Sequence, residues 1–256
     1  MRRTSHLQLA AITAASSLAF SAPAAQSSAQ APASAAARLT PAGTQQQCEH
    51  ENLILRPMSE FPNTPIGRAN SRRQATHIEY ALLCMVNAER ARLAKAMGWL
   101  IPQARIPKSI GRPGRPSKPG LGGAAARHLR DSLALRWWGR VTPGKNCIPQ
   151  KEKPELCDSH INPQNNSTPH GRAAETTFPG GCKGWSVAEN TYVGWGQQHV
   201  TPRAAFEAWR KSFPHYKNMI QGGEYMVVSV ALGSADPDAG STVPAVTYVQ
   251  MFGSCW

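Results

Sequence analysis

Three short segments decide how this chain is interpreted: SHINP at residues 159–163, AEN at residues 188–190 and AWRKSFPH at residues 208–215. Each contributes one side chain that can bind a metal ion or move a proton, namely His160, Glu189 and His215. Two imidazoles and a carboxylate suit zinc or another divalent cation, with an open position for water or a ligand. The spacings between the three residues form no local motif, so the residues alone leave open whether they converge.

Around these segments, helical and strand patterns alternate irregularly. Apolar periodicity and Thr-Pro starts predict helices over residues 76–97, 123–138, a short stretch from 168, and 201–212. Val, Tyr and small residues predict strands over residues 186–194, 225–232 and 243–253. Hairpin-like strands at the end of such a chain predict an α+β fold, an α-β-α sandwich with a central, mainly antiparallel sheet.

Two local details belong to the predicted helices. The first helix is expected to begin at Thr76, because Glu79 stands three residues later and completes a capping box. In the second helix, His128 lies off the apolar stripe and is expected at the surface.

The N-terminal region has the features of an exported protein. Residues 1–24 are expected to be a signal peptide, because Arg2 and Arg3 precede a short apolar stretch and a small-residue cleavage pattern. Residues 25–47 should form a disordered linker, and residues 48–75 an irregular extension. No later segment approaches the length of a transmembrane helix, so we expect a secreted protein, periplasmic or extracellular, without such a segment in its mature chain.

The cysteines support export. All six follow the predicted signal peptide: Cys48, Cys84, Cys147, Cys157, Cys182 and Cys255. An even number of cysteines in an exported chain predicts disulfide bonds, and no CxxC pair indicates a zinc knuckle. Six cysteines allow fifteen pairings, so the residues alone leave the connectivity open.

The formal net charge is +13, and part of it is concentrated in one Pro- and Gly-rich loop. The loop contains no acidic residue and five basic ones: Arg105, Lys108, Arg112, Arg115 and Lys118. Such a loop either contacts an anionic surface or is simply solvated. No aromatic residue is interleaved with these cations, so nucleic acid is not an expected partner.

Taken in order, the motifs resemble the CAP superfamily in its bacterial secreted branch. This superfamily, also called the SCP domain, includes cysteine-rich secretory proteins, antigen 5 proteins and pathogenesis-related 1 proteins. The matching motifs are LLCMVNAER at residues 82–90, SH at 159–160, TPHGR at 168–172, AEN at 188–190, SFPHY at 212–216 and YVQMFG at 248–253. The resemblance implies a CAP domain over residues 76–256, with insertions near residues 102–120 and 139–158.

The resemblance implies a cleft that holds His160, Glu189 and His215. Arg172 matches an arginine that orders the loop after His160. Ser212 stands where the animal and plant branch has a second acidic residue, so the implied set is a triad of possible metal ligands. Zinc or another divalent cation is the implied cofactor.

The resemblance also favours one disulfide, between Cys48 and Cys84, which would tie the N-terminal extension to the first helix. Cys147 and Cys157 would then close a loop within the second insertion, which leaves Cys182 to pair with Cys255.

Three functions are compatible with these features. The first is a non-enzymatic binding module, expected to be a monomer, whose His/Glu cleft holds a divalent metal or a small, lipid-like or protein ligand. The second is a metal-dependent hydrolase or peptidase with Glu189 as general base. The third is an envelope or host-surface interaction protein that acts through the basic loop. No Ser or Cys occupies a nucleophile motif, so the binding module is preferred and no catalytic residue is assigned.

Overall fold

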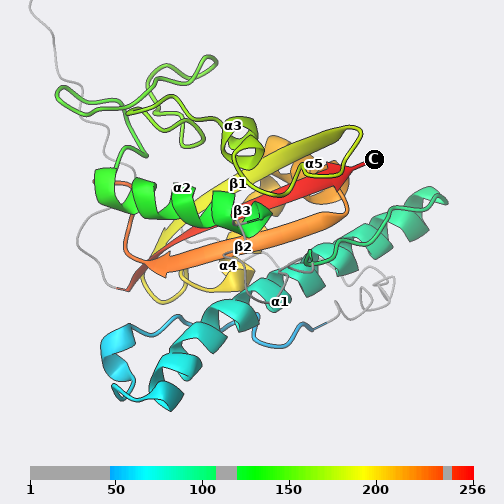
Figure 1. Cartoon of the computed structure of the whole chain (residues 1–256), viewed down its shortest axis with the longest axis horizontal. Coiled ribbons are helices and arrows are strands. Elements are labelled where there is room, and N and C mark those ends of the chain that lie inside the picture. The colour runs from blue at the N-terminus through cyan, green and yellow to red at the C-terminus, as the bar shows by residue number, and fades with distance from the viewer. Residues whose placement is uncertain (1–46, 108–119, 239–243) are drawn as a thin grey trace, which may run out of the picture. The chain divides into compact units, whose positions relative to one another are not determined.

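The computed structural model describes residues 47–107, 120–238 and 244–256. All of them belong to one compact unit, residues 45–256. The predicted signal peptide, nearly all of the predicted linker and four of the five cations of the basic loop lie outside the described residues. The elements, labelled in Figure 1, are η1 (Met58–Glu60), α1 (Pro65–Met97), α2 (Leu121–Leu135), α3 (Pro169–Ala174), β1 (Trp185–Trp195), α4 (Pro202–Lys211), α5 (Phe213–Gln221), β2 (Tyr225–Leu232) and β3 (Ala245–Cys255).

The strands form a small antiparallel sheet in the order β1-β3-β2. The last strand in the sequence is therefore central and pairs with both others, with Glu189 opposite Met251 and Asn190 opposite Gln250. The three strands lie close to their predicted positions, because each is rich in the valine and aromatic residues that favour strands. An α+β fold with an antiparallel sheet is thus confirmed.

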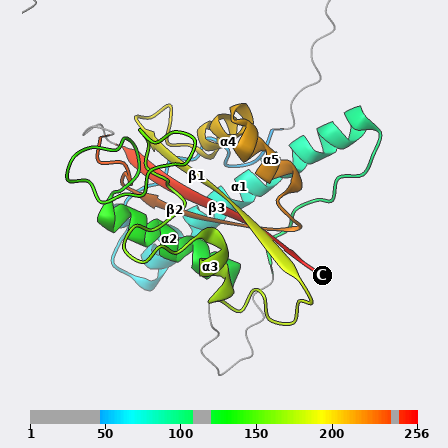
Figure 2. The ribbon, with the colours of Figure 1, turned by 90° about the horizontal axis from the view of Figure 1, so that it is seen from above.

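Alternate residues of β3 supply two separate apolar cores. Tyr248 and Phe252 belong to a core built with α1, α4 and α5, whereas Val249 and Met251 belong to a core built with α2 and α3. Figure 2 shows α4 and α5 on one side of the sheet and α2 and α3 on the other. None of the helices in the described ranges is long and apolar enough to cross a membrane.

The prediction for the start of the first helix was wrong. α1 begins at Pro65, and the hydroxyl of Thr64 accepts a hydrogen bond from the Gly67 amide at 3.1 Å. This is the same Thr-Pro start that begins α3 and α4. Glu79 caps nothing, since its carboxylate accepts a hydrogen bond from the Val228 amide of β2. Residues 65–75 of the predicted irregular extension are therefore helical.

Two further boundaries differ from the predictions. The second helix ends at Leu135, because Arg136 adopts a left-handed conformation with φ of 52° and closes the helix. A helix that was not predicted, α5, follows α4 after a break at Ser212, whose backbone is extended. Pro214 lies in its first turn, where a missing amide hydrogen costs no helical hydrogen bond.

The six cysteines form three disulfide bonds, and the expected pairing is confirmed: Cys48–Cys84, Cys147–Cys157 and Cys182–Cys255. The first ties the N-terminal segment to α1, and the third joins the segment before β1 to the end of β3. The second closes the inserted loop over residues 139–158, which also pairs with itself between Arg140 and Leu156. Disulfides of native domains typically contribute about 2–4 kcal/mol each.

Candidate functional site

Glu189 lies at the centre of a buried polar cluster on β1. Odd-numbered residues of β1, such as Val187 and Val193, pack into the core built with α2 and α3. The side chain of Glu189 therefore faces the same helices. Nη2 of Arg172 donates to both carboxylate oxygens, at 2.9 and 2.8 Å. Nδ1 of His160 lies 3.0 Å from Oε1 of the same carboxylate. The structure therefore brings together three of the predicted site residues.

Arg172 connects α3 to the loop that carries His160. Its Nη1 donates to the carbonyl oxygens of His160 at 3.0 Å and of Ser167 at 2.7 Å. The side chain is 1% exposed, so these contacts and the carboxylate of Glu189 replace the hydration of its two terminal nitrogens, while its buried Nε has no hydrogen-bond partner among the described residues. Arg172 therefore fixes the loop around His160 relative to β1.

His215 stands beside this cluster without joining it. It lies in the first turn of α5, and its ring centroid is 6.4 Å from that of His160. The backbone is held by Asn190, whose amide donates to the His215 carbonyl at 3.2 Å and to Gln250 at 3.0 Å. Among the described residues, neither ring nitrogen of His215 has a hydrogen-bond partner. His215 is thus placed by its backbone and leaves its imidazole available.

His128 is the member of the cluster that the sequence reasoning missed. It was expected at the surface, but it is fully buried. Its Nε2 lies 2.8 Å from the carbonyl oxygen of Ser159 and 3.6 Å from Oε1 of Glu189. The missed signal is a second stripe on α2, in which Ala124 and Ser132 flank His128 four residues away on either side and are themselves buried.

The cluster shifts the protonation of its members in opposite directions. Burial opposes ionisation of Glu189, but His128, His160 and Arg172 outweigh it and hold the pKa of the carboxyl well below its usual range. Burial also lowers the pKa of His160, yet the hydrogen bond and charge of Glu189 prevail, so that pKa is raised. Burial lowers the pKa of both His128 and His215 to about 4. At neutral pH, Glu189 is therefore charged, while His128 and His215 are neutral.

The predicted metal ligands do not form a metal site in this arrangement. Within residues 47–107, 120–238 and 244–256, no group of three or more His, Cys, Asp or Glu side chains is placed to hold a metal ion. Glu189 is not free to bind a cation, because both of its oxygens contact the cationic guanidinium of Arg172. His160 and His215 remain as two neighbouring imidazoles. Zinc or another divalent cation stays a prediction that this geometry does not favour.

A cavity of about 290 Å³ adjoins the cluster on the side of the inserted loop. It is lined by Trp138, Gly139, Gln150, Leu156, Cys157, Ser159, Thr191, Tyr192, Val193, Trp195 and Asp236. Ser159 and Thr191 connect the cavity to the cluster, since their hydroxyls are 2.8 Å apart and the Ser159 carbonyl contacts His128. The buried indole N–H of Trp138 has no hydrogen-bond partner in the described part of the chain. The insertion therefore helps to form a hollow beside the predicted cleft.

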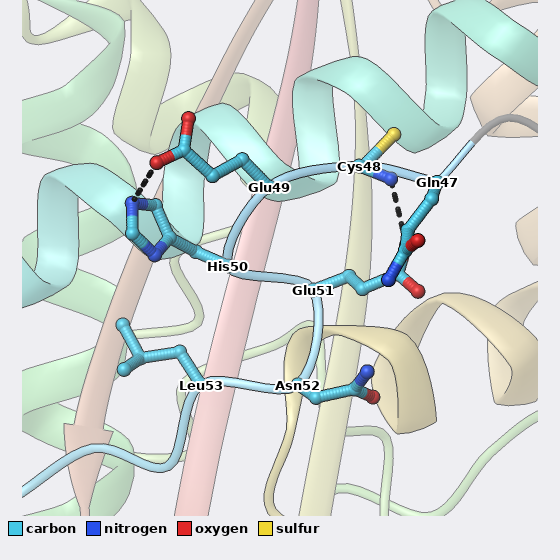
Figure 3. Close-up of a pocket in the computed structure, with 7 residues that line it drawn as sticks. All are labelled: Gln47, Cys48, Glu49, His50, Glu51, Asn52 and Leu53. Atoms are coloured by element: carbon cyan, nitrogen blue, oxygen red, sulfur yellow. Dashed lines mark hydrogen bonds and ion pairs between the residues drawn. The ribbon is translucent and has the colours of Figure 1, made fainter.

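A second, more open hollow of about 550 Å³ lies at the N-terminal segment (Figure 3). It is lined only by the consecutive residues 47–53, and Nε2 of His50 lies 3.1 Å from a carboxylate oxygen of Glu49. The ring of His50 stacks on that of His77, with centroids 4.1 Å apart. No residue of the polar cluster around Glu189 lines it, so this hollow is not part of the candidate site.

Comparison with known proteins gives no match. No protein-family model matches the chain, and no curated protein or solved structure matches it either. The resemblance to the CAP superfamily therefore depends on the sequence motifs alone.

Proposed function

We propose that this chain is a secreted, CAP-like binding module that acts without catalysis and holds a small ligand at His160, His215 and the adjoining cavity. The ordered motifs support the family, and so does the sheet covered by helices on both sides, as in an α-β-α sandwich. Three disulfides support export, since such bonds persist in oxidising compartments.

The observation that carries the proposal is the environment of Glu189. Its side chain is 1% exposed, and Arg172 and His160 occupy its oxygens. A general base must reach the proton that it removes, and its pKa should lie near the working pH. A buried carboxylate with a strongly lowered pKa meets neither condition, so the hydrolase alternative loses its base.

The groups that remain for a ligand suit a neutral, partly apolar molecule. Tyr192, Trp195 and Leu156 give the cavity an apolar wall, and polar residues such as Gln150 and Thr191 line the rest of it. Small-molecule sites commonly combine an apolar lining with a few placed polar groups. His160 directly follows the lining residue Ser159, and its one-third-exposed imidazole adds a donor or acceptor.

Native mass spectrometry of the protein purified from an exporting host tests the proposal. The wild type is compared with His160→Ala/His215→Ala and with Trp195→Ala, which alters the cavity wall. We expect a bound small-molecule mass in the wild type that is lost or reduced in both variants. Phe213→Ala, an exposed aromatic residue outside the cavity lining, is the matched control and should retain the ligand.

Two outcomes would contradict the proposal. A bare mass for the wild type, even after zinc is added, would mean that the cleft holds nothing. Turnover of peptide or ester substrates that disappears in Glu189→Gln while metal content is unchanged would instead support the hydrolase.

A further inference from the structure

Three large apolar side chains are exposed together where α1 ends. Met97, Trp99 and Leu100 are 49%, 62% and 90% exposed. Gly98 closes the helix in a left-handed conformation with φ of 71° and directs the chain away from it. Figures 1 and 2 both show this end of α1 projecting beyond the sheet. Met97, Trp99 and Leu100 are called the α1 tip below.

The chain returns from the α1 tip along a fixed path. The buried guanidinium of Arg90 donates to the Pro102 carbonyl at 2.9 Å. The side chain of Asn87 exchanges two hydrogen bonds with the backbone of Ala104, at 2.9 and 2.7 Å. Arg105 then forms a backbone bridge to the start of β2. Because both sides of the turn are anchored, the α1 tip is held outside the core instead of folding onto it.

The surroundings of the α1 tip are basic. Lys95, in the last turn of α1, is exposed and makes no ion pair with any described residue. Arg92 and Arg105 are also exposed at their side chains, although each pairs with a glutamate, Glu89 and Glu224. In the sequence, no acidic residue occurs between Arg90 and Arg130, and four more cations follow the tip at Lys108, Arg112, Arg115 and Lys118. Among the described residues, Lys95 therefore leaves an unpaired positive charge beside the tip.

A membrane surface fits these features better than a protein partner does. A stable protein interface buries about 800 Å² on each side, which three side chains on a projecting turn do not supply. Trp beside aliphatic and basic residues is typical of segments that enter the headgroup region of a bilayer. Cations near that surface are attracted by anionic lipids. We infer that the α1 tip inserts into the interface of a membrane that contains anionic lipids.

Vesicle co-sedimentation of the secreted protein tests this inference. The probes are vesicles of phosphatidylcholine with phosphatidylglycerol and vesicles of phosphatidylcholine alone. We expect binding to the anionic vesicles that weakens with added salt. Trp99→Ala/Leu100→Ala should bind at least about tenfold more weakly, because the inserted apolar groups are removed. Ile66→Ala is the matched control, since Ile66 is 74% exposed at the opposite end of the same helix.

The melting temperature of each variant separates loss of binding from loss of fold, and all three replaced side chains are exposed enough to leave it unchanged. Quenching of tryptophan fluorescence by brominated lipids in the wild type, absent in Trp99→Phe, would support insertion at Trp99 itself. Absence of wild-type binding, or equal binding by the double variant, would overturn the inference. A wild-type dimer that dissociates in the double variant would overturn it too, because a second copy would then cover the tip.

Discussion

Two arginines are buried in the described part of the chain, and their charges are balanced in different ways. Arg172 faces the carboxylate of Glu189 and two carbonyl oxygens. Arg90 has no carboxylate partner among the described residues. Its guanidinium donates to the carbonyl oxygens of Met219, Pro102 and Gly223, at 2.7, 2.9 and 2.9 Å. Burial lowers the pKa of Arg90 to about 10, so it is still charged at neutral pH.

This difference in charge balance distinguishes a purely structural arginine, Arg90, from one that belongs to the candidate site, Arg172. Arg90 joins three backbone segments, at the end of α5, after the α1 tip and before β2, and leaves no reactive group. Arg172 instead holds a carboxylate that in turn shifts the protonation of His160 and His128. A buried charge balanced by carbonyls therefore fixes the chain, whereas one balanced by a carboxylate also sets the electrostatics of its neighbours.

The largest expected effect is the loss of Glu189. Glu189→Ala leaves the guanidinium of Arg172 buried without its counter-charge, which should lower the free energy of unfolding by about 3–5 kcal/mol. The double variant Glu189→Ala/Arg172→Met should lose much less, because the unpaired charge is gone. Urea denaturation measures both values. If the single variant lost less than the double variant, the pairing described above would be wrong.

Acid should have the next largest effect, through His128. Its pKa is lowered from 6.5 to about 4 in the folded chain, mainly by burial. The unfolded chain then binds the proton more readily, so stability falls as pH drops through this interval. The loss from this residue reaches about 3 kcal/mol at the lower end. Thermal unfolding of the wild type and of His128→Gln at several pH values measures it, and the variant should show a smaller acid-induced loss.

His160 opposes this trend because its pKa is raised, so its contribution favours the folded chain as pH falls through the histidine range. An identical pH dependence in the wild type and in His128→Gln would contradict the burial of a neutral His128.

His128 also marks the limit of what the sequence can predict. The strands and the starts of α3 and α4 depend on local signals, namely runs rich in Val and Tyr and the Thr-Pro pairs at Thr168 and Thr201. The same signal at Thr64 was overlooked in favour of Thr76. The convergence of a loop, a strand and two helices on Glu189 has no local signature. It followed from the family resemblance for His160 and Arg172, and nothing in that resemblance pointed to His128.

Removing Arg90 should have a smaller effect than removing Glu189. Arg90→Met leaves three carbonyl oxygens without their donor but also removes a buried cation, and the expected net loss is about 2 kcal/mol. The change should be local, with faster hydrogen exchange at the Ala104 amide than at the centre of β3. Exchange that rises equally throughout the sheet would show that Arg90 supports the whole core rather than the segment after the α1 tip.

The smallest expected effect on stability is at His215. His215→Ala should cost less than about 1 kcal/mol, because its ring nitrogens have no hydrogen-bond partner among the described residues and its backbone is held through Asn190. His160→Ala should cost more, since it removes a hydrogen bond to a charged group, typically about 1.5–3 kcal/mol. Chemical denaturation of the two single variants gives this ranking directly. If both variants lose the ligand but mainly His160→Ala loses stability, the two roles are separated. His160 then supports the charged cluster, and His215 contacts the ligand. The reverse ranking would mean that His215 carries structural contacts and that the cleft has no imidazole free for binding.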